Sequence, residues 1–207
     1  VQSLVGSIMV ETILLLSGGV DSTCLAYSER PDLGITVDYG QASAEAEIQA
    51  ATQICDQLDI QHTIIEADCS DVGAGSMSDQ NQLDIASTPE WWPFRNQLII
   101  TLVATEAVKI GASELIVGSV KDDHEHADGR MEFYEKMDDL LSFQEGNLSI
   151  SVPAIDQTTV ELIQASGTPR SLLGWTHSCH TSNAPCGDCR GCRKRHRVFS
   201  EAFEKSI

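Results

Sequence analysis

Short apolar runs alternate with longer segments of helical periodicity over most of this chain. The runs that we expect to form strands are 13–16, 34–38, 62–66, 114–118 and 148–152. The segments that we expect to form helices are 22–30, 42–58, 97–110, 131–145, 158–165 and 194–205. Strands that alternate with helices favour a parallel sheet covered on both faces. The pattern therefore predicts an α/β fold with a Rossmann-like, doubly wound sheet of five parallel strands.

The same pattern divides the chain into two unequal parts. We expect one domain over residues 1–170 and a small C-terminal segment, 171–207, that ends in a helix. Between residues 67 and 92 the periodicity disappears into Asp, Ser, Gly and Asn. A compact domain seldom keeps so long a loop, so we expect a lid or a mobile connection there.

Composition narrows the range of partners. The chain has 13 Lys and Arg against 31 Asp and Glu, a formal net charge of -18. This charge would repel a phosphate backbone, so a small molecule or a basic protein is a better partner than nucleic acid. Residues 1–16 contain no Lys or Arg and only a short apolar run. We therefore expect neither a secretory signal nor a membrane span, and a cytoplasmic protein.

Glycine and serine follow the first apolar run, in the stretch Ser17-Gly18-Gly19-Val20-Asp21-Ser22. Glycines let the backbone approach an anion, serine hydroxyls can donate, and the next helix adds the positive end of its dipole. The stretch has no lysine, so it is not a Walker-type loop. We predict a phosphate-binding loop here.

Further candidates lie where a doubly wound sheet binds its ligands. They are Asp38-Tyr39-Gly40-Gln41, Arg95-Asn96, and Gly118 with the charged run 119–130 that follows it. Each also has a structural interpretation, respectively a turn, a local ion pair and a solvated loop. The charged run contains Lys121 and Arg130. We count both as candidate catalytic residues, together with Asp21 and Ser22.

Four of the seven cysteines gather near the end of the chain, at Cys179, Cys186, Cys189 and Cys192. Two overlapping Cys-x2-Cys steps and a fourth nearby thiol are typical of zinc sites. Four thiolates leave Zn²⁺ no open position, so we expect a structural ion that holds the C-terminal segment in place. An iron–sulfur cluster and redox thiols are the alternatives.

The glycine loop resembles the pyrophosphate-binding Ser-Gly-Gly-x-Asp-Ser loop of the N-type ATP pyrophosphatases, which have a HUP-like fold. Combined with the four cysteines, it resembles the 7-cyano-7-deazaguanine synthase family of queuosine biosynthesis. The similarity covers nearly the whole chain and includes 38–41, 95–96, 128–133 and Ser178-Cys179. It implies an ATP-dependent carbon–nitrogen ligase for a deazapurine. Such a ligase adenylates the carboxylate of 7-carboxy-7-deazaguanine with ATP and Mg²⁺, forms the amide with ammonia, and dehydrates it to the nitrile with a second ATP.

The resemblance also implies roles for single residues. The loop residues, Val20 included, clamp the pyrophosphate, and Asp21 orients the loop or reaches Mg²⁺ through water. The carboxylates of 122, 123 and 128 accept hydrogen bonds from a guanine-like edge, and Arg130 or Arg95 holds the substrate carboxylate. Family members are often dimers, which allows a homodimer here, although no sequence feature fixes one.

Three departures from the family pattern, one of them the loss of a phosphate-facing lysine, indicate that the adenylation core is kept while the acceptor side has changed. The stretch 120–127 is charged where the family is rich in Tyr, Ser and Gly. Thr159 stands in place of the lysine in the family's Thr-Lys-x-Glu-Ile stretch, and His180 in place of its usual tyrosine. Lys121 is a candidate replacement for the absent cation.

Two other functions stay open. In one, the adenylate passes to a different amine, such as one on a protein partner. In the other, the chain is a non-catalytic nucleotide-binding module of a larger assembly.

Overall fold

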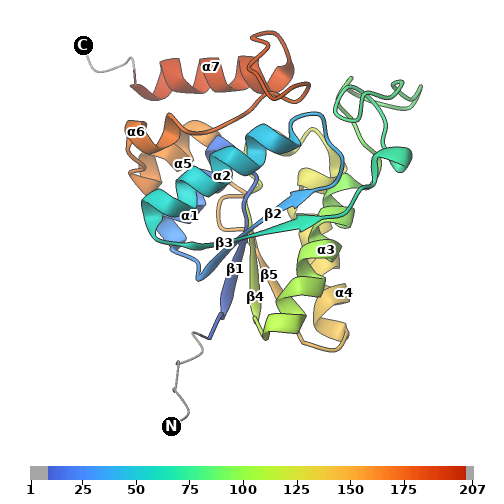
Figure 1. Ribbon diagram of the computed structural model, residues 1–207, viewed down its shortest axis with the longest axis vertical. Coiled ribbons are helices and arrows are strands. Elements are labelled where there is room, and N and C mark those ends of the chain that lie inside the picture. Colours follow the sequence, from blue (N-terminus) through green and yellow to red (C-terminus); the bar gives the residue numbers. More distant parts are fainter. Residues whose placement is uncertain (1–8, 204–207) are drawn as a thin grey trace.

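Five parallel strands form the single sheet of the computed structural model, which describes residues 9–203 (Figure 1). The strands are β1 (Thr12–Leu15), β2 (Leu33–Asp38), β3 (Gln61–Glu66), β4 (Glu114–Val117) and β5 (Ser149–Ser151). Their order is β3-β2-β1-β4-β5, and every neighbouring pair is parallel. The predicted α/β fold with a doubly wound, five-stranded parallel sheet is confirmed.

Helices cover both faces of this sheet (Figure 1). One face carries α3 (Arg95–Ile110) and α4 (Met131–Phe143). The other carries α1 (Val20–Glu29), α2 (Ala44–Leu58), α5 (Thr159–Ser166) and α6 (Arg170–Leu173), and α7 (Arg190–Phe203) packs outside α5. The sheet is therefore the middle of three layers.

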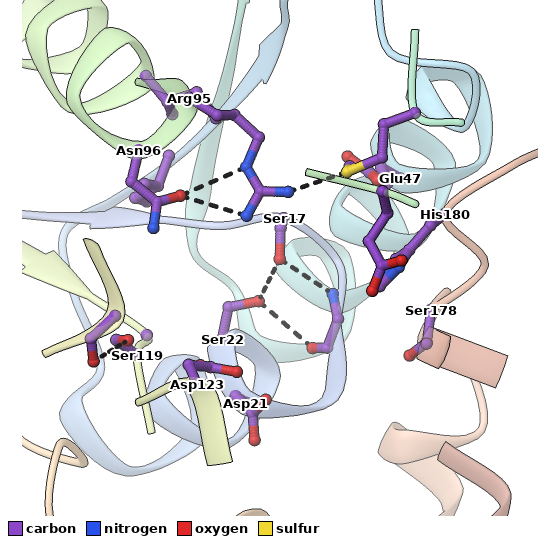
Figure 2. Close-up of a pocket in the computed structure, with 18 of the residues that line it drawn as sticks. Ser17, Asp21, Ser22, Glu47, Arg95, Asn96, Ser119, Asp123, Ser178 and His180 are labelled. Atoms are coloured by element: carbon purple, nitrogen blue, oxygen red, sulfur yellow. Dashed lines mark hydrogen bonds between the residues drawn. The ribbon is translucent and has the colours of Figure 1, made fainter. Parts of the chain in front are cut away.

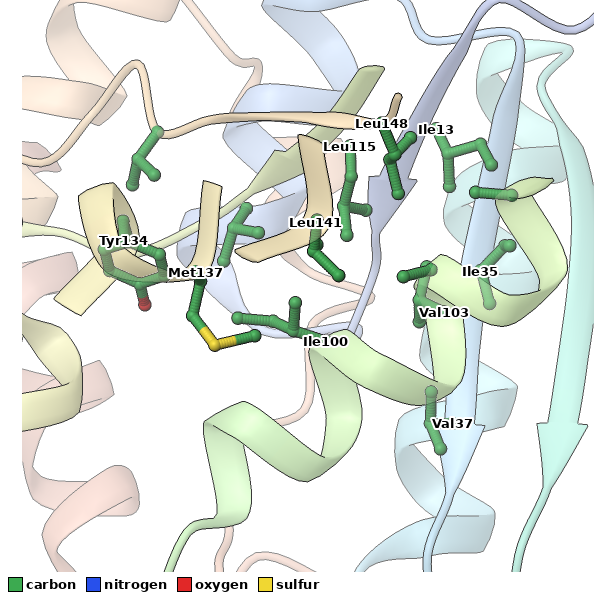
Figure 3. Packing of buried hydrophobic residues seen from close by; sticks show 14 of the residues in the cluster. Ile13, Ile35, Val37, Ile100, Val103, Leu115, Tyr134, Met137, Leu141 and Leu148 are labelled. Carbon is green, nitrogen blue, oxygen red and sulfur yellow. The ribbon is translucent and has the colours of Figure 1, made fainter. Parts of the chain in front are cut away.

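Alternate residues of β1 and β4 contribute to two separate hydrophobic clusters. Ile13, Ile35 and Leu115 of the sheet belong to one cluster with Ile100 of α3 (Figure 3). Leu14, the neighbour of Ile13, belongs to the cluster under α1 and α5. Both side chains are fully buried. A strand buried on both faces needs an unbroken apolar run, which is what residues 13–16 provide.

The long connection between β3 and α3 is anchored at its end. It contains turns and the 3-10 helix η1 (Ser70–Val72). Met77 and Trp92 are both buried, and the Trp92 ring packs edge-on against Tyr39 with centroids 5.1 Å apart. This part of the expected loop is therefore packed against the core.

The predicted helices differ from the observed ones by one or two residues at their ends, except for two larger differences. The last helix begins at Arg190, four residues before the predicted start, and its second residue, Gly191, lies so close to the Ser178 carbonyl that a Cβ would overlap it. That contact carries no periodic signal. The short helix α6 was not predicted. The last two residues of the predicted helix 194–205 lie outside the described residues. So do residues 1–8 of the stretch 1–16, in which we expect no secretory signal.

None of the helices within residues 9–203 is long and apolar enough to span a bilayer.

Phe94 gives a test of backbone strain at the start of α3. It is 78% exposed and has φ +56°, a left-handed conformation that costs a non-glycine residue about 1–2 kcal/mol. We expect Phe94→Gly to raise the free energy of unfolding by about 0.5–1 kcal/mol in urea titrations. At the other end of α3, Gly111 has φ +80° and no atom within 4 Å of a built Cβ. Gly111→Ala should lower the free energy by a similar amount, and equal signs for both variants would contradict the interpretation.

Candidate functional site

The turn after β1 forms a compact loop around Gly18 and Gly19. The Gly19 N–H and the Ser22 hydroxyl lie 3.4 and 3.2 Å from the Ser17 hydroxyl. Gly18 has φ +70°, and a Cβ there would lie 2.7 Å from the Glu47 carbonyl of α2. Only glycine fits between the loop and that helix. The predicted glycine loop therefore exists as a tight turn at the start of α1.

A second loop meets the first because β1 and β4 are neighbours in the sheet. A Cβ on Gly118 would lie 3.2 Å from the Ser22 Cα, so the two loops are almost in backbone contact. After Gly118 the chain forms the 3-10 helices η2 (Lys121–Asp123) and η3 (Ala127–Gly129). This is the crevice at which doubly wound sheets bind ligands.

A cavity of about 360 Å³ lies at this crevice (Figure 2). It is lined by both loops, by the start of α3, by the segment before the cysteines and by α7. Of the predicted site residues, those that line it are Ser17, Gly19, Val20, Asp21, Ser22, Tyr39, Arg95, Asn96, Gly118, Asp122, Asp123, Asp128 and Cys179. The structure thus brings the glycine loop and the Arg-Asn pair to one cavity.

The other predicted residues lie outside the cavity lining. Gly18 supports the loop from behind, while Asp38, Gly40 and Gln41 form a local network: the Gly40 N–H donates to Asp38, and the Tyr39 N–H donates to Gln41. Lys121 is exposed. Arg130 is also exposed, and its Nε donates to the His124 carbonyl at 2.8 Å.

Arg95 and Glu47 form a polar group at the α3 end of the cavity. The Arg95 guanidinium donates to the Asn96 amide oxygen at 3.3–3.4 Å (Figure 2). Burial raises the pKa of Glu47, although its carboxylate accepts hydrogen bonds from Ser43 and Gln41. Sequence reasoning missed Glu47. Its position in the sequence was the available signal. Glu47 lies in the first turn of α2, and that helix follows the candidate binding stretch 38–41.

An acidic group lies at the other end of the cavity, beside the glycine loop. Burial raises the pKa of Asp21, and the charge of Asp123 raises it further, whereas Lys194 lowers it. The Lys194 ammonium lies 3.2 Å from Asp21 and 3.5 Å from Asp123. One oxygen of Asp21 and the Thr159 hydroxyl are buried without a hydrogen-bond partner. One partnerless carboxylate oxygen beside a second carboxylate is a suitable start of a donor set for Mg²⁺.

The four predicted cysteines converge into one group. Their ligand atoms all lie within 4.8 Å of one another, and two pairs, Cys179–Cys189 and Cys186–Cys192, are 3.9 Å apart. Zn–S bonds of about 2.3 Å in a tetrahedron place sulfur atoms about 3.8 Å apart. Backbone N–H groups of His180, Cys189 and Cys192 also point at sulfur atoms. The cluster can therefore bind a metal such as zinc.

The three histidines near the cysteines are not needed as ligands for that cluster. His177 lies 3.1 Å from the Ser182 carbonyl, and His196 is exposed. His180 lines the cavity, and burial lowers its pKa to about 4. Its ring is therefore neutral at pH 7.

The fold and the site together define a class. This is an α/β protein with a doubly wound parallel sheet, a glycine loop at the strand crossover and a C-terminal four-cysteine cluster. Residues 11–203 match the family described as queuosine biosynthesis protein QueC. The chain belongs to that family.

Relatives cover almost the full chain. A 7-cyano-7-deazaguanine synthase of Campylobacter curvus is 30% identical, covering 95% of this chain and 96% of the relative. A protein with the same name from Methanobrevibacter smithii is 28% identical, covering 94% of this chain and 95% of the relative. Another, from Methanocaldococcus jannaschii, is 27% identical, covering 92% of this chain and 94% of the relative. The family resemblance predicted from the motifs is confirmed.

Two glycines with similar backbone angles test how tightly the loop packs on α2. Gly167 has φ +65° with no atom within 4 Å of a built Cβ, whereas a Cβ on Gly18 would also meet Ala50 at 2.8 Å. We expect Gly167→Ala to lower the free energy of unfolding by about 1 kcal/mol and Gly18→Ala by about 2–4 kcal/mol. Urea titration measures both. Equal losses would contradict the close contact.

Metal content tests the cysteine cluster. We expect about one zinc ion per chain in reduced protein, measured by plasma emission spectroscopy. Cys186→Ser should lose most of the metal and lower the melting temperature by on the order of 10 °C. Cys69→Ser removes a free thiol outside the cluster and should keep the metal. Wild-type protein without a bound ion would refute the assignment.

Proposed function

We propose that this chain is an ATP-dependent ligase that adenylates the carboxylate of 7-carboxy-7-deazaguanine, or of a close relative, and converts it to the amide and the nitrile. The observation that supports this most is the glycine loop opening into the cavity shared with Arg95 and Asp123, in a chain whose relatives are named 7-cyano-7-deazaguanine synthases. A carboxylate is a poor electrophile until one oxygen becomes a leaving group. Transfer to the α-phosphate of ATP makes that oxygen part of AMP.

The loop suits the pyrophosphate end of ATP. Ser17 and Ser22 offer hydroxyls, the Gly19 backbone approaches closely, and α1 begins at Val20 with its unpaired N–H groups. Donors held in place before the substrate arrives cost little reorganisation when charge develops on the leaving pyrophosphate. The loop thus clamps the leaving group while the carboxylate attacks in line.

Asp21 and Asp123 would hold Mg²⁺, because their carboxylates lie beside the loop and one Asp21 oxygen has no partner. When bound, the ion would neutralise phosphate charge.

The far end of the cavity suits the deazapurine. Asp128 lines the cavity and offers an acceptor for a guanine-like N–H edge, and the Asn96 amide donates to the Asp128 carbonyl at 3.1 Å. Arg95 is the cavity-lining cation suited to the substrate carboxylate. Arg130 is less suited to that role because its Nε is engaged by His124.

A second candidate keeps the adenylate and changes the amine. It is favoured by the charged rim of the cavity, where Arg190 pairs with Glu125 at 2.6 Å and lies 3.8 Å from Glu90. In this alternative, an amine on a protein replaces ammonia as acceptor. Mass spectrometry of products formed with ammonia or with a candidate protein separates the two.

Pyrophosphate release tests the proposed function. Purified, metal-loaded protein should release pyrophosphate from ATP when 7-carboxy-7-deazaguanine is added, and only slowly without it. Asp21→Ala should reduce the rate by at least about 100-fold because it removes a carboxylate at the loop. Asp56→Ala changes an exposed acid on α2 away from the cavity and serves as the control. Absence of substrate-stimulated release by the wild type would refute the proposal.

A further inference from the structure

Helix α7 brings an ammonium group to the glycine loop. The Lys194 Nζ lies 3.2 Å from the Asp21 carboxylate and 3.5 Å from the Asp123 carboxylate. The side chains of Lys194 and Asp21 are only 25% and 19% exposed. Both residues line the cavity that Ser17 and Ser22 also line. This ion pair is therefore part of the cavity wall and not a surface contact.

The other cationic side chains that line the cavity are engaged away from the loop. Arg195 donates to the Thr176 hydroxyl and the Leu173 carbonyl and stacks on Phe199. Arg190 pairs with Glu125.

Arg95 donates to Asn96 at the α3 end. Among the lysines and arginines within residues 9–203, Lys194 alone forms an ion pair with a residue of the glycine loop, Asp21. Lys121, the candidate replacement for the absent cation, is exposed and lies outside the cavity lining.

The surroundings of Lys194 leave it donor capacity. An ammonium has three N–H donors, and two carboxylates can take two of them. Thr159 lies on the same wall of the cavity, and its buried hydroxyl has no partner. Thr159 is also the position at which the expected lysine is missing. The site therefore has one unengaged ammonium donor and one unengaged hydroxyl beside a loop suited to phosphate.

We propose that Lys194 binds phosphate oxygens of the nucleotide held at Ser17–Ser22, with its free N–H as donor. The inference rests on the proposed function and assigns the cation of that site to a residue of the C-terminal segment. Its carboxylate partners fix the ammonium at the loop before the nucleotide arrives. Charge-assisted bonds to phosphate are roughly twice as strong as neutral ones, which makes the lysine a main determinant of affinity.

Calorimetric titration with inorganic pyrophosphate in the presence of MgCl₂ tests this assignment. We expect Lys194→Met to weaken pyrophosphate binding on the order of tenfold to a hundredfold, because one charge-assisted bond is lost. Lys194→Arg should restore most of the affinity. Arg193→Met removes the neighbouring, exposed cation that pairs with Asp188, and should change the affinity less than twofold. Equal affinity of Lys194→Met and wild type would overturn the assignment.

A variant background without the two acids separates phosphate binding from simple neutralisation. Asp21→Asn and Asp123→Asn together remove both carboxylate partners of Lys194, and titration in EDTA removes any part played by Mg²⁺. If Lys194 binds phosphate, adding Lys194→Met to this background still weakens pyrophosphate binding. If the lysine only offsets the carboxylates, adding it changes nothing and the assignment fails.

Failure of the proposed function gives a different result. In that case the wild type neither binds pyrophosphate nor releases it from ATP, and the assignment of Lys194 fails with it. Wild-type release of pyrophosphate together with unchanged affinity of Lys194→Met would overturn the lysine assignment alone.

Discussion

The central position of β1 determines where the cavity can form. This strand is hydrogen-bonded on both edges to parallel neighbours, β2 and β4. The helix that follows β1 packs on one face of the sheet, and the helix that follows the β4 loops packs on the other. The two connections therefore separate at the carboxyl end of the sheet and leave a crevice. Gly18 and Gly118 allow the walls of that crevice to approach α2 and Ser22 closely.

The cationic side chains of this acidic chain are concentrated at the cavity. The chain has a formal net charge of -18. Yet Arg95, Arg190, Lys194 and Arg195 all line one cavity, three of them from α7. The same lining contains six acidic residues, so its ratio of cations to acids, four to six, is higher than the 13 to 31 of the whole chain. Cations gathered in a partly closed cavity can attract a small anion even when the rest of the surface repels it. This distribution is compatible with a nucleotide ligand and unfavourable for a long nucleic acid.

Local patterns in the sequence were enough to predict the sheet and the loop. Residues 13–16 form a strand because both faces are buried, and the glycines that follow mark a close backbone approach. The four cysteines could be grouped because their spacing is short. In each case the signal lies within a few residues, and the structure adds only small shifts of boundary.

Long-range contacts were beyond local patterns. Lys194 reaches Asp21 across 173 positions of the chain, and no periodicity records that pairing. Lys121 has the right charge and lies next to the acids in sequence, but it is exposed and does not line the cavity. Arg130 turns back onto its own loop at the His124 carbonyl. The direction of a side chain in a 3-10 turn depends on hydrogen bonds that composition does not reveal.

The four-cysteine cluster and the cavity share one rigid element. Cys192 and Lys194 lie two residues apart in α7, so a thiol of the cluster and the ammonium beside the glycine loop belong to the same helix. A metal ion bound by the cluster would tether the start of that helix. Loss of such an ion would loosen the contact of Lys194 with Asp21 and Asp123 and leave their charges less compensated. Metal occupancy of the cluster would then influence the electrostatic potential that an incoming anion meets.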